Sequence, residues 1–418
     1  MPRVLNKNGL IAVLDIGTSK TVCLIARPVG DDGFEPVAAG TVQSLGVDKS
    51  EIADLKDAVS TINHALAAAE RETGERIETV VASACAGTLT SALINESVDL
   101  GGQETTEADM SLLIEKAQSK IPENAGEILH CIPIDYAVDA RHEIKNPLGL
   151  SGDKLSVVMH TVEAPVYPVR DMNAVLDQSR IQCSKKVASP YAAGLCCLKK
   201  EEAEQGSVVI DLGAGTTGIG FFYNGQFVFC DKIPIGANRL TKDLVKHFEM
   251  SYADAERIKT LYGSAVPSSA YEKTDIAYPI IGDDSRVNNV VVPQSEIVRI
   301  IEKRIEEIFI SVRTVLESRG FYEYCMNVVL TGGGSKLHGV CEKAEEILER
   351  KVRIGYPVHW PERQHVLKEA QYPFCATAIG LLYYTTRHLL NSSYAREATV
   401  RSNNKIVRFF RWFLDNVK

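Results

Sequence analysis

The chain has 418 residues, of which 45% are hydrophobic and 24% are charged. This length and balance describe a globular protein with two to four domains rather than a single core. The formal net charge of -8 argues against a general nucleic-acid-binding protein, because phosphate backbones demand a basic surface. The charge is uneven: residues 391–418 carry six Arg or Lys and two Asp or Glu, a balance of +4, which leaves -12 on the remainder.

The cysteines and the apolar segments indicate a protein of the reducing cytoplasm. Ten cysteines are scattered along the chain, with no CxxC pair and no His or Cys cluster at zinc-ligand spacing. We therefore expect reduced, mostly buried thiols. The apolar run at 10–14 is too short for a signal peptide, and no segment reaches about 18 uninterrupted apolar residues. The sequence predicts a protein that is made and stays in the cytoplasm.

The first glycine turn in chain order is DIGTSKT at residues 15–21, which ends an apolar, strand-like run. Glycine lets the backbone turn tightly, so that neighbouring N–H groups point into one anion-binding concavity, to which Ser and Thr hydroxyls add donors. A carboxylate beside such a turn suggests a hydrated metal ion, so we expect Asp15 to orient waters on Mg²⁺. The residues expected to hold one side of a phosphate chain are Gly17, Thr18, Ser19 and Lys20.

The next segments predict a first α/β unit with an insertion. Apolar residues at helical spacing predict a helix that begins near Ser50, and residues 78–84 read as a strand. The segment from about Ala86 to Val162 mixes short strands and helices and lacks a phosphate motif, so we expect an inserted subdomain there. Strand and helix patterns return after it and lead into the apolar connecting segment VASPYAAGLCC from Val187.

The turn pattern recurs as DLGAGTTG at residues 211–218. Its glycine spacing would also suit a dinucleotide fold, but that fold needs a helix next, whereas IGFFYNGQFVF predicts a hairpin around Asn224-Gly225. No P-loop motif occurs. A turn that merely connects strands remains the alternative for either copy alone. Two copies predict two half-sites facing one nucleoside triphosphate with Mg²⁺, the second formed by Asp211, Gly213, Gly215, Thr216 and Thr217.

The last third of the chain adds helices and a third glycine turn. A polar, helical region is expected over 241–320, with a capping box at Ser251 and a long helix from Ser295 that Gly320 can end. NVVLTGGGSKLHG from Asn327 then reads as a strand that enters a triple-glycine turn. Its missing side chains leave room for a sugar and base, so the residues expected against the nucleoside are Gly332, Gly333, Gly334, Ser335 and Lys336.

Three such motifs in this order resemble the actin, Hsp70 and sugar-kinase superfamily. The strings KNPLGLSG, DAERIKTLYG, VVLTGGGSKLHG and ATAIGLLYY are similar to those of one branch, the FtsA family of bacterial cell-division actin homologues, through almost the whole chain. The resemblance implies an α/β, actin-like, duplicated ATPase fold with an inserted 1C subdomain and a C-terminal amphipathic helix. The implied boundaries are 1–83 and 164–195 for subdomain 1A, 84–163 for 1C, 196–240 and 325–390 for 2A, 241–324 for 2B, 391–403 for a flexible linker and 404–418 for the helix.

The resemblance also carries expectations about the chemistry. It implies that Glu256 and Lys259 lie near the nucleoside, although such an i, i+3 pair could equally be an ordinary exposed ion pair on a helix. Many relatives have an acidic or amide side chain before the proline of the connecting segment, where it positions the attacking water. Here that residue is Ser189, a poor base, so we expect tight ATP binding with weak or undetectable hydrolysis and assign no catalytic residue.

The last fifteen residues predict an amphipathic membrane anchor. Projected as a helix, they separate an apolar face from a basic one, and a polar segment precedes them. The alternative is a terminal helix that docks on the protein's own core. Members of the FtsA family end in a membrane-targeting helix, which supports an anchor for anionic lipid of the inner membrane. The residues assigned to it are Ile406, Arg408, Phe409, Phe410, Arg411, Trp412, Phe413, Leu414 and Val417.

The partners follow from the resemblance alone. It implies a protein that polymerises with copies of itself, lies at the division site on the inner face of the cytoplasmic membrane, tethers the tail of FtsZ there, and helps recruit later division proteins. Arg299, Lys303 and Arg304 are candidate contacts for that acidic tail, or else a solvated basic stripe. A pilus-assembly actin homologue, or less plausibly a metabolic kinase of the superfamily, remains the alternative.

Overall fold

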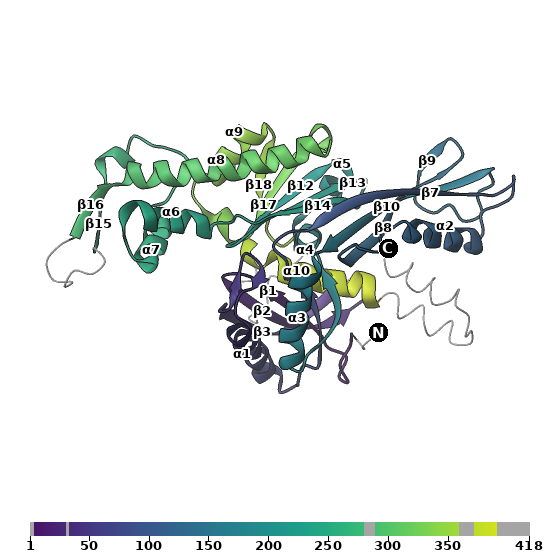
Figure 1. The fold of residues 1–418 in the computed structure, drawn as a ribbon, viewed down its shortest axis with the longest axis horizontal. Coiled ribbons are helices and arrows are strands. Elements are labelled where there is room, and N and C mark those ends of the chain that lie inside the picture. Colours follow the sequence, from purple (N-terminus) through teal and green to yellow (C-terminus); the bar gives the residue numbers. More distant parts are fainter. Residues whose placement is uncertain (1–3, 31–32, 280–288, 359–371, 391–418) are drawn as a thin grey trace.

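Two five-stranded mixed sheets with one common topology form the centre of the protein (Figure 1). This computed structural model describes residues 4–30, 33–279, 289–358 and 372–390, so the predicted linker and membrane helix at 391–418 lie outside the described residues. In each sheet three antiparallel strands form a meander. A later strand pairs in parallel with the first strand of the meander, and a second later strand pairs in parallel with that added strand. The repeated strand order is the duplication that the paired motifs predict.

The first sheet has the strand order β11-β6-β1-β2-β3. Its central strand is enclosed on both faces, which explains why the sequence IAVLDI is almost continuously apolar up to its aspartate. The strands are β1 (Ile11–Ile16), β2 (Lys20–Val29), β3 (Gly33–Gln43), β6 (Thr79–Ser83) and β11 (Gln182–Val187).

The second sheet has the order β14-β13-β12-β17-β18, and its central strand SVVIDL repeats the pattern of β1. β13 and β14 form the hairpin that the sequence predicts, with Asn224 and Gly225 both at positive φ in its turn. The strands are β12 (Ser207–Leu212), β13 (Thr217–Tyr223), β14 (Gln226–Ile233), β17 (Asn327–Thr331) and β18 (Lys351–Ile354).

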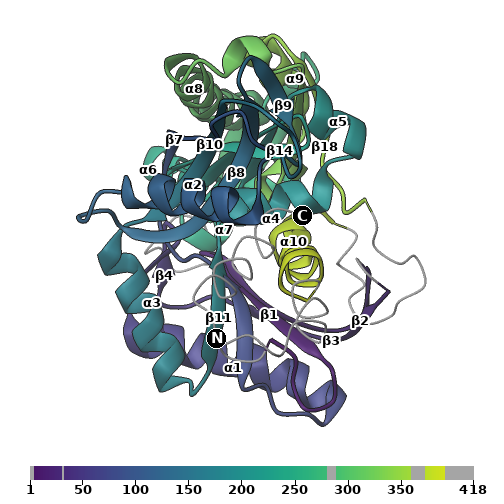
Figure 2. The ribbon, with the colours of Figure 1, turned by 90° about the vertical axis from the view of Figure 1, so that its right-hand side faces the viewer.

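Two inner helices separate the sheets, and each covers a sheet of the other half of the chain. α10 (Ala376–Tyr384), near the end of the described chain, packs on β1, β2, β3 and β6 of the first sheet. α4 (Ser189–Cys197), which follows the last strand of the first sheet, packs on the second sheet. The two helices also pack on each other inside one hydrophobic core, and Figure 2 shows α10 between the sheets.

The outer faces of the sheets carry separate layers. α1 (Leu55–Thr73) and α3 (Val166–Gln178) cover the first sheet and α5 (Lys200–Gln205) lies beside the second. The predicted helix start near Ser50 is wrong, because a short hairpin of β4 (Val47–Asp48) and β5 (Glu51–Ile52) occupies that stretch and the helix begins at Leu55. Asp54 caps α1 by accepting a bond from the Asp57 N–H.

An inserted α/β unit extends from the first half and lies beside the second sheet. Its sheet, in the order β7-β10-β8-β9, packs on one helix around a core of its own. His160 Nδ1 donates to the Phe227 carbonyl of β14 at 2.7 Å, and the Cys230 N–H of the same strand donates to Ser91. The elements are β7 (Thr90–Asp99), α2 (Glu107–Ser119), β8 (Glu127–Val138), β9 (Arg141–Ile144) and β10 (Lys154–Ala164).

The second extension lies at the opposite end of the molecule (Figure 1) and consists mainly of helices. Ser251 caps its second helix, as the sequence predicts, and the long helix begins within one residue of the expected Ser295 and ends before Gly320. Its elements are α6 (Asn238–Phe248), α7 (Tyr252–Tyr262), β15 (Asp275–Pro279), β16 (Asn289–Pro293) and α8 (Gln294–Ser318).

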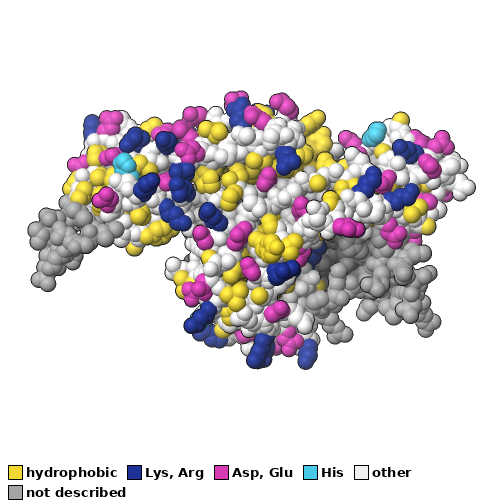
Figure 3. Space-filling view, viewed as in Figure 1, with side chains coloured by type: hydrophobic (Ala, Val, Ile, Leu, Met, Phe, Trp, Pro, Cys, Tyr) yellow, Lys and Arg dark blue, Asp and Glu magenta, His cyan; other side chains and the backbone are white. Residues whose placement is uncertain are grey.

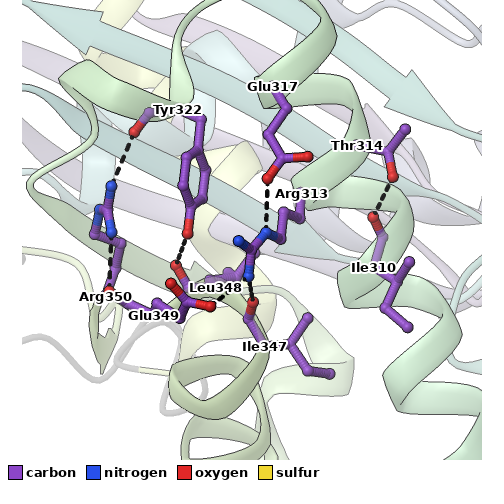
Figure 4. Close-up of polar contacts among 9 residues, drawn as sticks. All are labelled: Ile310, Arg313, Thr314, Glu317, Tyr322, Ile347, Leu348, Glu349 and Arg350. Atoms are coloured by element: carbon purple, nitrogen blue, oxygen red, sulfur yellow. Dashed lines mark hydrogen bonds and ion pairs between the residues drawn. The ribbon is translucent and has the colours of Figure 1, made fainter.

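Side-chain ties fix the last turns of α8 to α9 (Val340–Leu348), as Figure 4 shows. Arg313 pairs with Glu349 at 2.8 Å, and the Tyr322 hydroxyl donates to the Leu348 carbonyl at 2.9 Å. The guanidinium groups of Arg313 and Arg350 lie 4.9 and 4.5 Å from the Tyr322 ring centroid. These contacts fix the C-terminal end of α8, and with it the second extension, against α9.

Candidate functional site

A cavity of about 770 Å³ lies between the two halves, where the central strands β1 and β12 end. The loops after these strands line it from two sides, and α7 and the triple-glycine turn line it as well. The structure therefore brings all three glycine motifs, which are more than 300 residues apart at their extremes, to one enclosed volume.

The first glycine turn is tight enough to require glycine. The Gly17 N–H donates to the Lys20 carbonyl at 3.1 Å, and a Cβ at position 17 would lie 2.8 Å from that oxygen. Any side chain here would push the turn open. The predicted residues Gly17, Thr18, Ser19 and Lys20 all line the cavity.

The second glycine turn has the same closure and an additional support beneath it. The Gly213 N–H donates to the Thr216 carbonyl at 3.0 Å. Gly236, just before α6, packs so closely below that a Cβ there would lie 2.6 Å from the carbonyl oxygens of Gly213 and Ala214. Gly213, Gly215 and Thr216 line the cavity as expected.

Two predicted residues do not reach the cavity. The Thr217 side chain is fully buried, and its hydroxyl donates to the Ile235 carbonyl at 2.7 Å. The Ser335 hydroxyl likewise donates to the Gly332 carbonyl at 2.7 Å, and the residue is buried. Both hydroxyls stabilise the loops in which they lie, so they shape the cavity without forming part of its wall.

The two halves touch through their glycine turns. A Cβ at Gly215 would lie 2.4 Å from Thr18 Oγ1 and 2.8 Å from the Cα of Lys49, so only glycine permits this approach. The Ser50 N–H donates to Thr18 Oγ1 at 2.9 Å, and the Ser50 hydroxyl shares a hydrogen bond of 3.1 Å with that of Thr216. Ser50 is not among the predicted site residues, because the spacing of apolar residues in this stretch predicts a helix.

The two motif aspartates lie at the end of the cavity that the central strands form. Burial raises the pKa of Asp15 above its ordinary value. Burial, together with the negative charge of Asp15, raises the pKa of Asp211 to about 6, while the Thr377 hydroxyl donates to Asp211 at 3.2 Å. Two enclosed carboxylates that disfavour each other's charge fit a hydrated cation such as Mg²⁺.

Two cavity lysines rest on one aromatic ring. Lys20 Nζ lies 3.5 Å from the centroid of Phe374, and Lys336 Nζ lies 4.3 Å from the same centroid and 4.2 Å from that of Tyr372. A cation–π contact holds an ammonium group in place but does not neutralise its charge, whereas a carboxylate would neutralise it. The lysine of the first turn and the lysine of the third turn are thereby held toward one cavity.

Glu256 and Lys259 line the cavity and also pair with each other. Lys259 Nζ lies 2.7 Å from Glu256 Oε2 and donates to Thr241 Oγ1 at 3.0 Å, and the Thr241 hydroxyl donates to Glu256. Both sequence-based readings of the pair are therefore compatible with the structure: the two side chains form an intrahelical ion pair, and that pair forms part of the cavity wall.

The triple-glycine turn packs against the second motif. A Cβ at Gly332 would lie 2.3 Å from Asp211 Oδ1, and a Cβ at Gly334 would lie 2.5 Å from the Leu212 side chain. A Cβ at Gly333 would have no atom within 4 Å. The first and third glycines therefore serve close packing, whereas the middle one leaves open space in the cavity.

Ser189 lies at the start of α4 and lines the cavity beside the second motif. The next residue, Pro190, covers Gly218, at which a Cβ would lie 2.9 Å from Pro190 Cγ. The Ser189 hydroxyl can form a hydrogen bond with a water molecule. A neutral hydroxyl is a poor base, however, so it cannot efficiently accept a proton from that water.

The three basic candidates of α8 lie away from the cavity and differ in availability. Arg299 and Lys303 are exposed, the Arg299 side chain by 69%. Arg304 is only 20% exposed and is paired with Asp243 at 2.6 Å and with Glu307. Figure 3 shows further Lys and Arg side chains over this extension.

Metal, disulfide and membrane features complete the inventory of the described part of the chain. No group of three or more His, Cys, Asp or Glu side chains there could hold a metal directly, and no helix there is long and apolar enough to cross a membrane. All ten cysteines lie in described segments and are free thiols, eight of them buried. These free and mostly buried thiols agree with the expectation of reduced, mostly buried cysteines.

Comparison with known proteins gives the family. The cell division protein FtsA of Rhizobium meliloti (strain 1021) is 33% identical over 424 residues, which cover 98% of this chain and 95% of that protein. The chain belongs to the FtsA family. The FtsA protein of Agrobacterium fabrum (strain C58 / ATCC 33970) is 34% identical over 90% of this chain and 87% of its own length. The suspected family is thus confirmed.

Family models locate the similarity along the chain. The model of the cell division protein FtsA matches residues 208–380, and the model of the SHS2 domain inserted in FtsA matches residues 87–163. The second match covers most of the inserted α/β unit. FtsA membership makes the chain a cell-division actin homologue and favours that reading over the pilus-assembly alternative.

Solved structures confirm the fold. The PilM-PilN type IV pilus biogenesis complex matches with a TM-score of 0.59 and 18% identity, covering 89% of this chain and 97% of that one. MreB5 of Spiroplasma citri bound to ADP matches with a TM-score of 0.52 and 14% identity, covering 93% and 99%. At these identities the likeness concerns fold alone, and it confirms the actin-like architecture expected for an FtsA.

Proposed function

We propose that this FtsA-family chain binds ATP with Mg²⁺ in the cavity between its halves. The observation that carries the proposal is the convergence of two duplicated glycine turns, each preceded by an enclosed aspartate, on one volume. Bound Mg²⁺ would neutralise charge on the phosphates, and Asp15 and Asp211 would orient its waters. The turns would donate backbone N–H groups to the phosphates, with Lys20 on one side and Lys336 on the other.

The nucleoside would lie at the other end of the cavity, against Glu256, Lys259 and the open space at Gly333. Ser189 would occupy the position from which relatives orient the attacking water. Because its hydroxyl is a poor base, we expect turnover below about 1 per second, the low end of ordinary enzymes. ATP would then act mainly by closing the two halves on each other through the contacts of Ser50 and Thr216.

The subdomain assignment is part of the proposal. The two sheet halves correspond to 1A and 2A, the inserted unit to 1C, and the α6–α8 extension to 2B, with the boundaries given above. α10 is shared between the halves, since it follows the strands of 2A in sequence and covers the sheet of 1A.

We further propose that the protein is a polymerising adaptor at the division site. A basic amphipathic helix at 404–418 would anchor it peripherally on anionic lipid of the inner membrane face, with the acidic FtsZ tail bound at Arg299 and Lys303 of 2B. Arg304 would serve mainly the fold, because Asp243 and Glu307 already hold it. One short helix binds a membrane only marginally, so polymerisation would supply the avidity on which recruitment of later division proteins depends.

The test of the adaptor function is co-sedimentation with vesicles that contain anionic lipid, with and without ATP. The full chain should pellet, and a chain ending at Asn403 should stay in the supernatant while it still binds ATP. Added FtsZ should pellet only with the full chain. Membrane binding by the truncated chain would contradict the anchor, and failure of FtsZ to follow the full chain would contradict the adaptor role.

A further inference from the structure

One cavity residue belongs to none of the glycine motifs. Lys232, near the end of β14, lines the cavity although only 6% of the residue is exposed. Its ammonium group donates to the Ala86 carbonyl at 2.9 Å. A lysine so deeply enclosed is uncommon, because burial of a charge costs free energy unless partners compensate for it.

The strand register aims Lys232 at the metal end of the cavity. Asp211 on β12 pairs with Gly218 on β13, and Gly218 pairs in turn with Lys232 on β14. Directly paired residues of antiparallel strands share a face of the sheet, so the three lie in one row on the cavity side. Because the middle position is glycine, β13 itself places no side chain between the lysine and the aspartate, and the ring of Pro190 packs against this glycine.

Lys232 retains hydrogen-bonding capacity. An ammonium group has three donors, and the bond to Ala86 uses one. No carboxylate of the described residues lies within ion-pair distance. Burial lowers the pKa of Lys232, and Asp15 and Asp211 oppose this shift by attracting the ammonium across the cavity. The Lys232 ammonium is therefore buried, attracted toward the carboxylates and not neutralised by a direct ion pair. This arrangement is typical of a group that binds an anionic ligand.

The carbonyl partner gives Lys232 a second connection. Ala86 is fully buried and immediately precedes residues 87–163, which match the inserted SHS2 domain. The inserted unit rejoins the first half through β10 and Ala164, so the Ala86 segment is one of its two covalent junctions. Lys232 thus lies between the metal end of the cavity and a covalent junction of the inserted domain.

We propose that Lys232 binds the terminal phosphate of the bound nucleoside triphosphate and transmits its presence to the inserted domain through Ala86. This inference rests on the proposed nucleotide function. Glu256 and Lys259 mark the nucleoside end, so the phosphate farthest from the base reaches the end where Lys232, Asp15 and Asp211 meet. That phosphate fixes the ammonium in place, and a fixed ammonium holds the Ala86 carbonyl more firmly. With a diphosphate the junction is looser.

The test compares affinities for ATP and ADP, each with Mg²⁺, in the full chain and in Lys232→Met. We expect ATP to bind Lys232→Met at least tenfold more weakly, while ADP affinity changes less than twofold. Lys343→Met is the matched control: Lys343 is also buried, at 3% exposure, but pairs with Glu302 and Glu346 far from the cavity, so its loss should leave the ATP-to-ADP ratio unchanged.

Hydrogen exchange tests the link from Lys232 to the junction of the inserted domain. Peptides that cover residues 84–90 should exchange more slowly with ATP than with ADP in the unaltered chain, and this difference should vanish in Lys232→Met. Lys232→Gln keeps a donor without the charge, so it should lose the ATP preference as well, and it serves if Lys232→Met does not fold. An unchanged ATP-to-ADP ratio in either folded variant, or equal protection with both nucleotides, would overturn the inference. If the unaltered chain binds no nucleotide, the proposed function itself fails.

Discussion

Gly380 of α10 lies directly against the backbone of Ala192 in α4, so closely that a Cβ at position 380 would come within 1.8 Å of the Ala192 carbonyl oxygen. The contact is the crossing point of the two inner helices, between the two sheets. A side-chain atom there could be accommodated only by separating the helices, because the opposing atoms belong to backbone. Glycine at position 380 therefore permits the two inner helices to pack backbone against backbone.

Gly380→Ala should therefore destabilise the protein severely. Overpacking of a core typically costs about 1–3 kcal/mol, and a clash with backbone lies at or above that upper end. We expect a loss of roughly 3 kcal/mol or more in the free energy of unfolding, measured by urea denaturation. Gly333→Ala, where the new Cβ meets no atom within 4 Å, is the control for stability and should cost less than about 1 kcal/mol. Equal effects of the two substitutions would contradict the crossing-point argument.

Asp211→Asn should stabilise the nucleotide-free protein while it weakens Mg²⁺-dependent ATP binding. Burial raises the pKa of Asp211 to about 6, so at pH 7.5 the native state carries an unfavourable charge that asparagine removes, worth roughly 2–3 kcal/mol. We expect a higher Tm without ligand and no gain in ATP affinity on adding Mg²⁺. Asp231→Asn, on β14 outside the cavity, should keep the Mg²⁺ effect. A lower Tm for Asp211→Asn would mean that the carboxylate stabilises the empty fold.

We expect the contact between the inserted domain and β14 to weaken at acid pH, because His160 lies buried in it. Burial lowers the pKa of His160 to about 4, although its bond to the Phe227 carbonyl opposes the shift. The unfolded state, with an ordinary pKa near 6.5, takes up the proton first, so stability is lost as the pH falls from about 6.5 toward 4. By pH 5 this residue should account for about 2 kcal/mol.

The measurement for His160 is the free energy of unfolding at pH 7 and pH 5. His160→Gln should lose less stability on acidification than the unaltered chain, by that amount. His64→Gln changes an exposed histidine of α1 and should leave the pH dependence intact. If both variants lose as much free energy of unfolding on acidification as the unaltered chain, the contact of His160 with β14 is not the acid-sensitive one.

Gly215→Ala should hold the halves apart. The new Cβ would press on Thr18 and on the backbone of Lys49, so the closing contact could not form. We expect more than a tenfold loss of ATP affinity by isothermal titration. Ser50→Ala removes one hydrogen bond to Thr216 without a clash and should cost only about 1 kcal/mol, near fivefold. A fully active Gly215→Ala would show that the contact is not needed for binding.

Local signals predicted the motifs and elements that depend on neighbouring residues. The turn at Asn224-Gly225, the cap at Ser251 and the start of α8 each follow from chemistry within a few residues, and each is confirmed. The helix start near Ser50 is wrong for a related reason: Ile52 fits the helical spacing, but Lys49 and Ser50 adopt positive φ in a tight hairpin that spacing alone does not reveal.

Long-range packing supplied what the sequence could not. Nothing near residue 376 indicates that α10 covers strands at residues 11–43, because its apolar residues suit either sheet. Lys232 likewise has the appearance of an ordinary polar residue in an apolar strand, and only the register of three strands places it in one row with Asp211. Thr217 fits the motif by sequence, yet strand pairing turns its hydroxyl toward Ile235.

The exchange of inner helices determines the order in which the chain can fold during synthesis. β1 leaves the ribosome early, but the helix that covers one face of its sheet lies some 360 residues later. At about 5–20 residues per second, the apolar face of the first sheet waits on the order of tens of seconds for its cover. The nascent chain is therefore expected to need a chaperone until the last helix of the core emerges.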